Sequence, residues 1–533
     1  MKVQLRDPNT IMKLSRLGSF HQSKLSFLRS FLNEFKDWEY KRDLFNLDRF
    51  GYGEAVYSFK KDKRTYSLVC FANKIKDDER SDRVIATKWD AAFTLHDGVP
   101  TQKDIDRLKN EVPRQEVGRL SFKELTLSRA NKSVRVFNHV VERLSEGKQP
   151  DLELLSNVGY LYRTTAVYGS GKFGLADRFR IKNREEINGP FRLEMMLVYL
   201  VRQFTFDQVN HVAHHKNPSK SVVLDRKICK NLGIGNSTGL GMAPFIVNHP
   251  TLLNNWVMSR EIALKKIREI KIVKKKDSVL FIDCLKKSLT NITSWNTDSE
   301  YQQIKIKNLL KDIKKFIHFI DNNFDFEDEY PFNQIYLWLE EKACEECIEY
   351  VVSIMMEPYN EITNPLVSQM SSEEDKYFTI PTSRTIKDLI NIIEKKYSNI
   401  LKINFEKKQN TQNFWFISKN KEEPRLADRF EEGGSELEQP LAIARDVKKL
   451  HKKLLDTKNN STVAEFLSKN SELRHIVRRV FIVEKFPYSE IQDNTIGKNI
   501  MPIDMLRLKL SFFGALKFDP RSDKWLRICM FQG

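Results

Sequence analysis

Residues 232–250 combine glycines with short polar side chains in a pattern that is typical of a ligand-binding loop. Gly233 and Gly235 precede three consecutive polar residues, and two further glycines follow them. Glycines let backbone amide groups turn towards a ligand, and Asn, Ser and Thr add short hydrogen-bonding side chains, so we expect an anion or a carbonyl group as the ligand. The predicted ligand-binding residues of this stretch are Asn236, Ser237, Thr238, Gly239 and Gly241.

Known glycine motifs are incomplete in this stretch. The dinucleotide-binding fingerprint requires a third glycine or alanine where Pro244 stands, and the Walker A loop requires a lysine and a hydroxyl residue that are missing. Residues 235–239 match G-x-S-x-G, which would make Ser237 a nucleophile between a strand and a helix. Residues 230–234 make a poor buried strand, Pro244 would interrupt the helix, and no parallel βαβ rhythm is evident. A backbone-lined loop is therefore the favoured interpretation.

A second glycine-rich segment, residues 168–174, resembles half of a phosphate-binding loop. Ala166 and Phe173 stand where a Walker A loop needs a glycine and a hydroxyl residue, so the segment is not a P-loop. Its lysine and a nearby arginine can still hold a carboxylate or phosphate, as a point charge and as a fork. The alternative is a glycine turn between two helices with a solvated lysine. The predicted ligand-binding residues are Gly169, Ser170, Gly171, Lys172, Asp177 and Arg178.

Acid–base chemistry is predicted on a long apolar helix at residues 190–215. Asp207, His211 and His215 recur every four residues, so they lie along one side of this helix. Leu200 and Phe204 share that side, which should be partly buried and should shift the pKa of Asp207. We predict Asp207 and His211 as catalytic residues. A structural Asp207–His211 hydrogen bond is the alternative, and metal binding lacks a nameable third ligand.

Three further features favour ordinary structural roles. His96, Asp97 and Gly98 end a candidate strand, where Asp-Gly is typical of a turn. The CxxC at residues 344–347 has no second pair, so free thiols are expected. The basic clusters at residues 448–453 and 474–479 match no nucleic-acid-binding motif.

The elements that must position these residues alternate between helix and strand. Apolar spacing predicts an opening helical pair at 12–47, an antiparallel meander at 55–60, 66–73 and 83–95, and helices at 104–108 and 131–144. Lysine-rich amphipathic helices follow at 264–357, and the last of them spans 338–356. The final part mixes both kinds of element. Its predicted helices are 386–397, 441–455 and 463–469, and its predicted strands are 400–405, 414–418, 508–513 and 525–531.

This pattern predicts a multidomain α+β protein that is predominantly helical, with antiparallel sheet in its N-terminal and C-terminal parts. We divide it into four sections. They are an N-terminal α+β domain with the meander (1–148), a helical section with the glycine-rich loops (149–263), a lysine-rich helical middle domain or insertion (264–357) and a C-terminal α+β domain (358–533).

The composition indicates in which compartment the protein works, but it says little about the function. Hydrophobic residues make up 41% and charged residues 30% of the 533 residues, as in ordinary folded proteins. Six cysteines in so long a chain form no disulfide framework, and no apolar stretch reaches the length of a membrane span, so we expect a soluble cytoplasmic protein without a membrane partner. The net charge of +18 fits nucleic acid or another anion, but solvated lysine faces also explain it.

Two functions remain open at this point. The favoured one is a cytoplasmic enzyme that acts on a small anionic metabolite, a carboxylate or phosphate, bound by the glycine-rich loops and processed by Asp207 and His211. The alternative is a non-enzymatic basic protein that binds nucleic acid or an acidic protein partner. The residues indicate no particular cofactor, reaction class or oligomeric state.

Overall fold

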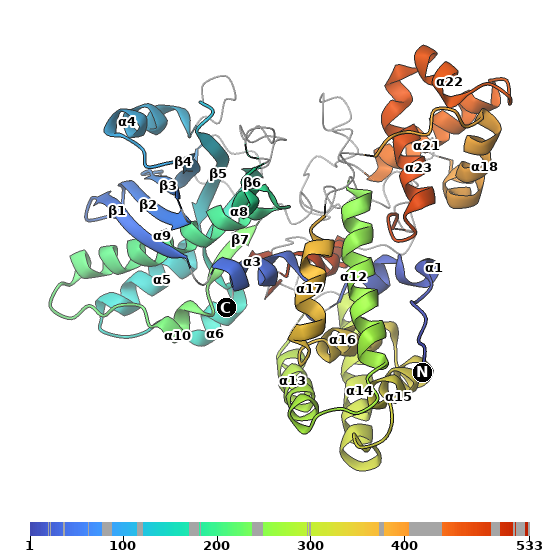
Figure 1. The fold of residues 1–533 in the computed structure, drawn as a ribbon. Helices are drawn as coiled ribbons and strands as arrows, with labels where there is room; N and C mark the ends of the chain where they lie inside the picture. The colour runs from blue at the N-terminus through green and yellow to red at the C-terminus, as the bar shows by residue number, and fades with distance from the viewer. Residues whose placement is uncertain are drawn as a thin grey trace. The chain divides into compact units, whose positions relative to one another are not determined.

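Two compact units make up the chain, and each contains residues that are distant in sequence (Figure 1). The sheet unit comprises Phe27–Gly239, Phe513–Asp519 and Leu526–Gly533, and the helical unit comprises Met1–Ser26, Leu240–Phe512 and Pro520–Trp525. The protein therefore mixes helix and sheet, as predicted, whereas the four sections stay a prediction. The computed structural model describes all residues except 20, 22, 36–37, 62, 77–87, 114–120, 170–180, 182, 237–248, 296, 298–299, 373–377, 405–439, 492–501, 515–516, 519–527 and 531–533.

One sheet organises the sheet unit, with the strand order β1-β2-β3-β4-β5-β6-β7-β9-β8 among the described residues. The antiparallel meander is confirmed, because β2, β3 and β4 are consecutive antiparallel neighbours. Its third strand, predicted at 83–95, is β4 and begins at Ala91, and residues 83–87 of the prediction lie outside the described residues. Within the described ladders, β6 and β7 alone are parallel. The strands are β1 (Glu39–Leu47), β2 (Gly53–Lys61), β3 (Arg64–Ala72), β4 (Ala91–Asp97), β5 (Glu124–Lys132), β6 (Tyr160–Gly169), β7 (Gly233–Asn236), β8 (Lys517–Phe518) and β9 (Ile528–Met530).

The opening helical pair predicted for residues 12–47 is only partly correct. Short helices form at α1 (Pro8–Ile11), α2 (Leu14–Leu17) and α3 (Phe27–Phe35), but residues 39–47 form strand β1. This strand pairs with β2, and most of its side chains are exposed. An edge strand with exposed side chains needs no alternation of apolar and polar residues, so the sequence carries no strand signal there.

Helices cover both faces of the sheet. The amphipathic helix α4 (Gln102–Glu111) packs Ile105 and Leu108 against Val56, Val69 and other apolar residues of one face. On the other face lie α9 (Arg192–Lys216) and, behind it, α5 (Val134–Ser145) (Figure 1). The predicted helices at 104–108, 131–144 and 190–215 are thus confirmed. The remaining helices of this unit are α6 (Leu152–Val158), α8 (Glu185–Asn188) and α10 (Arg226–Cys229).

The long helix α9 is buried on nearly all sides, because it packs against strands from β2 to β7 and against α5. Phe204 lies at its centre, with its ring 5.9 Å from that of Phe93 and 6.4 Å from that of Tyr57. The Gln208 amide donates to the carbonyl of Gly51 at 2.7 Å. An apolar run such as residues 195–201 is expected in a helix that is buried on most sides.

Helix α9 also forms the crossover between the parallel strands β6 and β7. Gly235 of β7 lies directly against the ring of Tyr160, the first residue of β6. A Cβ atom at position 235 would be 2.7 Å from ring carbon Cδ1, closer than van der Waals contact allows. The pairing of the two strands therefore depends on a glycine at this position.

We expect Gly235→Ala to lower the free energy of unfolding by about 1 to 3 kcal/mol, because the added methyl group must displace the Tyr160 ring. Urea unfolding followed by circular dichroism measures this change. The double variant Gly235→Ala with Tyr160→Leu should recover part of the loss. Equal losses in the single and double variants would show that the steric argument is wrong.

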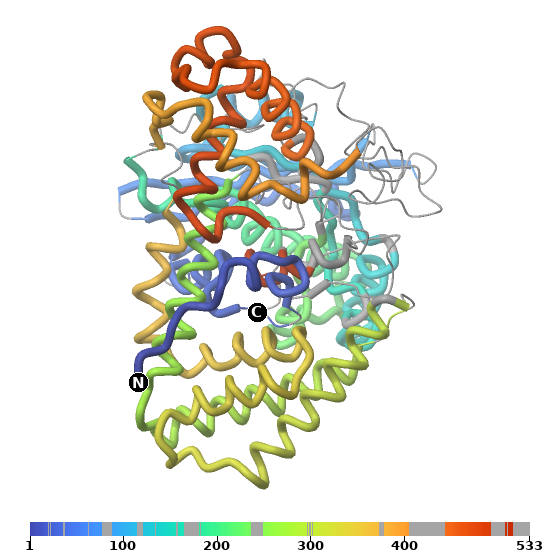
Figure 2. Tube along the Cα trace, turned by 90° about the vertical axis from the view of Figure 1, so that its right-hand side faces the viewer, coloured from blue at the N-terminus to red at the C-terminus, as the bar shows by residue number. Residues whose placement is uncertain are grey.

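The helical unit confirms the lysine-rich helices predicted for residues 264–357, with one correction. The predicted helix at 338–356 is interrupted: α15 ends at Lys342 and α16 begins at Glu345. The backbone amide of Cys344 instead donates to Asp312 of α14 at 2.8 Å. The helices are α12 (Pro250–Arg268), α13 (Lys275–Thr293), α14 (Glu300–Asn323), α15 (Pro331–Lys342), α16 (Glu345–Met355) and α17 (Asn360–Met370). Figure 2 shows α13, α14 and α16 packed side by side.

The C-terminal part is more helical than predicted. The three predicted helices are confirmed as α18 (Ile386–Lys396), α21 (Pro440–Leu455) and α22 (Val463–Lys469), and α23 (Arg474–Lys485) follows. Two predicted strands are wrong, since residues 398–401 form α19 (Ser398–Leu401) and residues 508–513 belong to α24 (Pro502–Phe513). Within the predicted strand 525–531, β9 is confirmed. The predicted strand 414–418 lies outside the described residues.

A buried charge network ties the first residues of the chain to helices α12 and α16. The guanidinium of Arg6 donates from Nε and Nη2 to both carboxylate oxygens of Glu261, at 2.8 and 2.6 Å, and from Nη1 to Glu349 at 2.7 Å. The side chains of Glu261 and Glu349 are 2% and 1% exposed. Forked hydrogen bonds from one arginine therefore satisfy two carboxylates that have almost no contact with water.

Candidate functional site

The two predicted glycine-rich segments begin at the carboxyl ends of neighbouring parallel strands. Gly169 is the last residue of β6 and Asn236 is the last residue of β7. Asn236 lies opposite Thr164, so β6 continues for five residues beyond the end of β7. The carboxyl ends of parallel strands are common places for ligand sites. The other predicted binding residues, Ser170, Gly171, Lys172, Asp177, Arg178, Ser237, Thr238, Gly239 and Gly241, lie outside the described residues.

These strands correct two arguments about the G-x-S-x-G match. Residues 233–236 are a strand, Ile234 is fully buried, and the β6–α9–β7 segment is a parallel crossover. A strand therefore leads directly to Ser237, as the nucleophile motif requires. The segment at Gly169 also differs from the alternative interpretation, because it follows a strand rather than a helix.

A polar cluster lies where strand β3 begins and strand β4 ends, at the same end of the sheet as the end of β6. Its members, which we call the Tyr66 cluster, come from β3, β4 and the segment before α9. The Tyr66 hydroxyl donates to Glu186 Oε1 at 2.5 Å, and Arg64 Nη1 donates to the same oxygen at 3.1 Å. Tyr66 lies opposite Asp97 in the β3–β4 ladder. The cluster consists of Arg64, Tyr66, Asp97, Arg184 and Glu186.

Arg184 has the most unusual position in this cluster. Its Nη2 atom forms an ion pair with Asp97 Oδ2 at 2.8 Å, and its side chain is 21% exposed. Its Nη1 atom is buried and has no hydrogen-bond partner among the described residues. Buried N–H groups of native proteins are nearly always hydrogen-bonded, so this guanidinium nitrogen is a donor that lacks its acceptor.

The charge states of the Tyr66 cluster follow from burial and pairing. Burial raises the pKa of the Tyr66 hydroxyl, and the hydrogen bond to Glu186 raises it further. Burial alone would raise the pKa of Glu186, but hydrogen bonds from Tyr66 and Arg64 outweigh it and lower that pKa. At neutral pH Tyr66 is therefore protonated and Glu186 is ionised. This pair binds and orients groups, since neither pKa lies near 7 where proton transfer is most efficient.

The sheet register places Gly169 close to this cluster. Gly169 lies opposite Thr126, which lies opposite Leu95, two residues before Asp97. Gly169 is thus two strands away from β4, or roughly 10 Å at the usual strand spacing. Gly169 precedes and Arg184 follows the segment that contains the predicted binding residues Lys172 and Arg178. Both of these described residues lie at this end of the sheet.

Asp207 contacts strands at the far side of the sheet. Its Oδ2 atom accepts hydrogen bonds from Tyr57 at 2.8 Å and from Arg42 at 3.2 Å. Tyr57 shares a row of the sheet with Gly169, with β3, β4 and β5 between them. Four strand spacings correspond to roughly 19 Å along the sheet. The structure thus does not bring Asp207 to the end of β6.

His211 lies near the opposite edge of the sheet. Its Nε2 atom is 2.9 Å from the carbonyl oxygen of Asp48, in the turn between β1 and β2, and its ring packs on Phe45. The Tyr66 cluster lies at the other end of β2, where the turn to β3 begins. His211 and Asp207 have separate partners, so the alternative of a hydrogen bond between them is not what the structure shows.

The remaining candidates from the sequence are the Asp-Gly turn and the two cysteines of the CxxC, and the structure describes the surroundings of each. Asp97 and Gly98 form a turn in which Gly98 adopts a φ of 92°, as the Asp-Gly signal predicts. Cys344 and Cys347 are free thiols. Burial raises the pKa of the Cys344 thiol to about 12 and that of Cys347 above its ordinary value, so neither is an activated nucleophile.

Comparison with known proteins adds no assignment, since no protein-family model, curated protein or solved structure matches this chain. In the part of the chain that the structure describes, no three His, Cys, Asp or Glu side chains are grouped as metal ligands. None of the described helices has both the length and the apolar character needed to cross a membrane.

Sequence analysis missed the Tyr66 cluster. Its members are spread over more than a hundred residues, and each of them is common on protein surfaces. The strand order brings them together, and this order is not encoded in local spacing. The only sequence signal was Asp97, which was assigned to the turn alone.

Proposed function

We propose that the chain binds a small anionic metabolite, a carboxylate or a phosphate, at the Tyr66 cluster and acts on it as an enzyme. The observation that carries this proposal is the buried Nη1 atom of Arg184, which has no partner among the described residues. Asp97 holds the neighbouring Nη2 atom and fixes the guanidinium in place. A fixed guanidinium with a spare nitrogen suits an oxyanion.

The glycine-rich segment after β6 supports the same location. Gly169 ends its strand about two strand spacings from β4, the strand whose last residue is Asp97. Lys172 and Arg178 follow in the sequence before the chain reaches Arg184, so both cations are proposed as further ligands of the anion. Asn236 and the residues after it are proposed to contribute backbone amides, because β7 runs parallel to β6.

Asp207 and His211 are not part of this proposal, because their partners lie on β1, β2 and the turn between them. The carboxylate of Glu186 and the hydroxyl of Tyr66 take their place as the polar groups beside the bound anion. Ser237 remains the candidate nucleophile of this region, since it directly follows β7.

Anion binding is tested with a pair of variants that separate Arg184 from its ion pair. Inorganic phosphate and succinate serve as probes in isothermal titration calorimetry at low ionic strength. We expect Arg184→Met to weaken binding of the preferred anion at least tenfold, because the fork is removed. Asp97→Asn removes the charge of this ion pair but keeps the guanidinium and an amide oxygen that can accept its hydrogen bond, so it should change affinity by less than threefold.

Two controls complete this test. Arg192→Met removes an arginine of the same unit that pairs with Glu34 and with no member of the cluster, and it should leave binding unchanged. Arg178→Ala should weaken binding as Arg184→Met does. Equal losses in the Arg184 and Asp97 variants, or no binding of either anion by the wild-type chain, would contradict the proposed site.

A further inference from the structure

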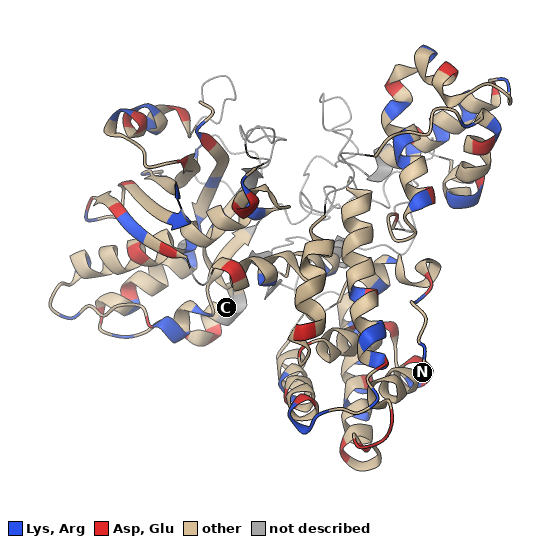
Figure 3. Cartoon of the chain, in the orientation of Figure 1, with Lys and Arg blue, Asp and Glu red and all other residues tan. Residues whose placement is uncertain are grey.

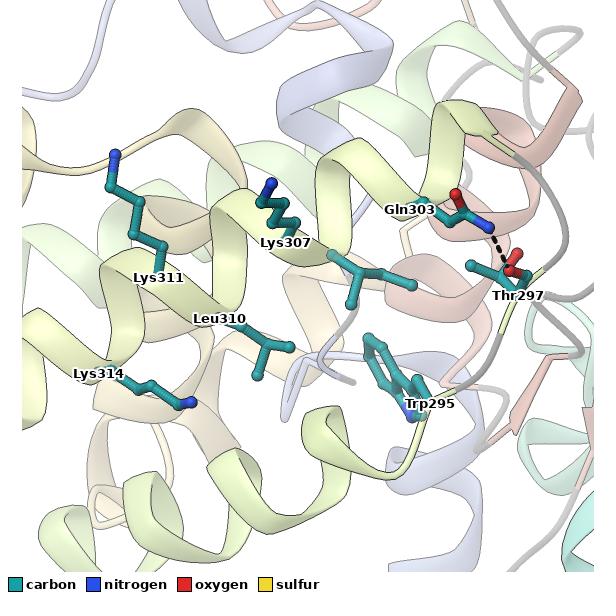
Figure 4. Close-up of a pocket in the computed structure, with 8 residues that line it drawn as sticks. Trp295, Thr297, Gln303, Lys307, Leu310, Lys311 and Lys314 are labelled. Atoms are coloured by element: carbon teal, nitrogen blue, oxygen red, sulfur yellow. Dashed lines mark hydrogen bonds between the residues drawn. The ribbon is translucent and has the colours of Figure 1, made fainter.

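A second site lies in the helical unit, where a pocket of about 440 Å³ opens along α14 (Figure 4). Its walls come from α14 and from Trp295 and Thr297, which precede this helix. This volume falls in the range of small-molecule sites, which is about 300 to 1,000 Å³. The lining residues are Trp295, Thr297, Gln303, Ile306, Lys307, Leu310, Lys311 and Lys314.

Three lysines form one wall of this pocket. Lys307, Lys311 and Lys314 are spaced by four and three residues, so they lie on one face of α14 and span about 10 Å of its length. None of the three forms an ion pair among the described residues. Neighbouring lysines do: Lys305 pairs with Glu346 at 2.5 Å, and Lys286 pairs with Asp321 at 3.3 Å.

These three lysines lack ion-pair partners among the described residues, although acidic side chains are common in this unit. Figure 3 shows acidic and basic residues interspersed over the helices of this unit. Acidic side chains that could neutralise the row are therefore present in the same helices. Three unpaired ammonium groups at one pocket create a local positive potential that attracts anions, and it attracts multiply charged anions most strongly.

The pocket also has an apolar surface. The indole of Trp295 lies on the side of α14 that carries Leu310 (Figure 4), and Ile306 of the same helix also lines the pocket. Gln303 donates its amide N–H to the carbonyl of Thr297 at 2.9 Å, which directs this polar side chain to the rim beside the indole. A planar ring can stack on an indole, and an amide side chain can form hydrogen bonds with the edge of such a ring.

We infer that this pocket binds a nucleoside phosphate, either as a free nucleotide or as one nucleotide of a single strand. The base stacks on Trp295, and the phosphates contact the lysine row. A simple carboxylate would use one lysine and leave the indole unused, whereas a nucleoside phosphate uses both walls. The site is independent of the Tyr66 cluster, which lies in the sheet unit.

The test uses the full-length chain and three probes: ATP, inorganic tripolyphosphate and a fluorescein-labelled fifteen-nucleotide oligo(dT). Calorimetry measures the first two, and fluorescence anisotropy measures the third, at low ionic strength. The triple variant Lys307→Gln, Lys311→Gln, Lys314→Gln should weaken nucleotide binding at least tenfold. Its matched control, Lys275→Gln, Lys276→Gln, Lys287→Gln, loses the same charge from exposed positions of α13 and should lose less than threefold.

The indole is tested separately. Trp295→Leu should weaken binding of ATP or the oligonucleotide by about fivefold or more, since base–aromatic stacking contributes roughly 1 to 3 kcal/mol per base. It should leave tripolyphosphate binding unchanged. Circular dichroism confirms that each variant is folded.

The probes also distinguish the two sources of the ligand. Displacement of the oligonucleotide by ATP at comparable concentration supports a free nucleotide, and tight oligonucleotide binding that ATP displaces weakly supports a single strand. Equal losses in the two lysine triple variants would overturn the inference, as would the lack of binding of all three probes. A Trp295→Leu variant that binds nucleotides normally would also overturn it.

Discussion

Replacing Arg6 by Met should lower the free energy of unfolding by about 3 to 5 kcal/mol, which is the usual cost of removing one partner from a buried ion pair. Methionine keeps the apolar stem of the side chain but removes every hydrogen bond that Arg6 makes to Glu261 and Glu349. Both carboxylates would then stay buried with fewer positive charges around them. Urea unfolding at pH 7, followed by far-UV circular dichroism, measures the change.

The pH dependence of this loss gives a second, independent check. Burial alone would raise the pKa of Glu349, but the charges of Arg6 and Arg260 outweigh it and lower that pKa in the folded chain. A lowered folded pKa contributes stability above the unfolded pKa, roughly 4.3, and this stability is lost as the pH falls through the folded value. The difference between wild type and Arg6→Met should therefore be largest near neutral pH and shrink below about pH 4.

Two control variants isolate the ion pair from other effects of the substitution. Lys2→Met removes a charge from an exposed position four residues away and should cost less than about 0.5 kcal/mol. Adding Glu261→Gln and Glu349→Gln to Arg6→Met removes the buried negative charges and should recover part of the stability. If Arg6→Met alone cost less than 1 kcal/mol, the network would not be a main tie between the N-terminal segment and α12.

The elements that sequence predicted well are those that contain a long buried apolar segment. Helix α9 carries apolar residues from Met195 to Val201, where strands and α5 surround it, and β2 and β3 are rich in apolar residues because both of their faces are buried. The wrong strand prediction at residues 508–513 has a different cause. In α24, Leu508, Leu510 and Phe512 alternate with polar residues as in a strand, but Arg507 and Ser511 are buried in the helical unit as well. Buried polar residues thus imitate a strand pattern.

The candidate site was less predictable than the fold for a related reason. Glycine-rich segments are visible in sequence because glycine is locally distinctive. Their separation from His211 depends on where α9 crosses the sheet, and the Tyr66 cluster depends on the β3–β4 register and on α8. These are long-range pairings. Local spacing determines which residues share a helix face, but it does not determine next to which strands of the sheet that face packs.

Replacing Phe204 by Ala should lower the free energy of unfolding by about 3 to 5 kcal/mol, because a fully buried aromatic side chain would leave a cavity between α9 and the sheet. Its ring contacts Tyr57 of β2 and Phe93 of β4. The same substitution at Phe50, which is 56% exposed in the turn after β1, should cost less than about 1 kcal/mol. Urea unfolding of both variants makes the comparison.

The outcome for Phe204 also bears on the proposed site. Helix α9 connects β6 to β7, so a cavity beneath it should loosen the parallel pair from which both glycine-rich segments extend. Phe204→Ala should therefore weaken binding of the anion probe even though Phe204 touches no ligand, whereas Phe204→Leu, which fills most of the volume, should retain both stability and binding. Normal anion affinity in a strongly destabilised Phe204→Ala variant would mean that the binding edge is held by β3, β4 and the Arg184–Asp97 ion pair alone, without support from the crossover helix.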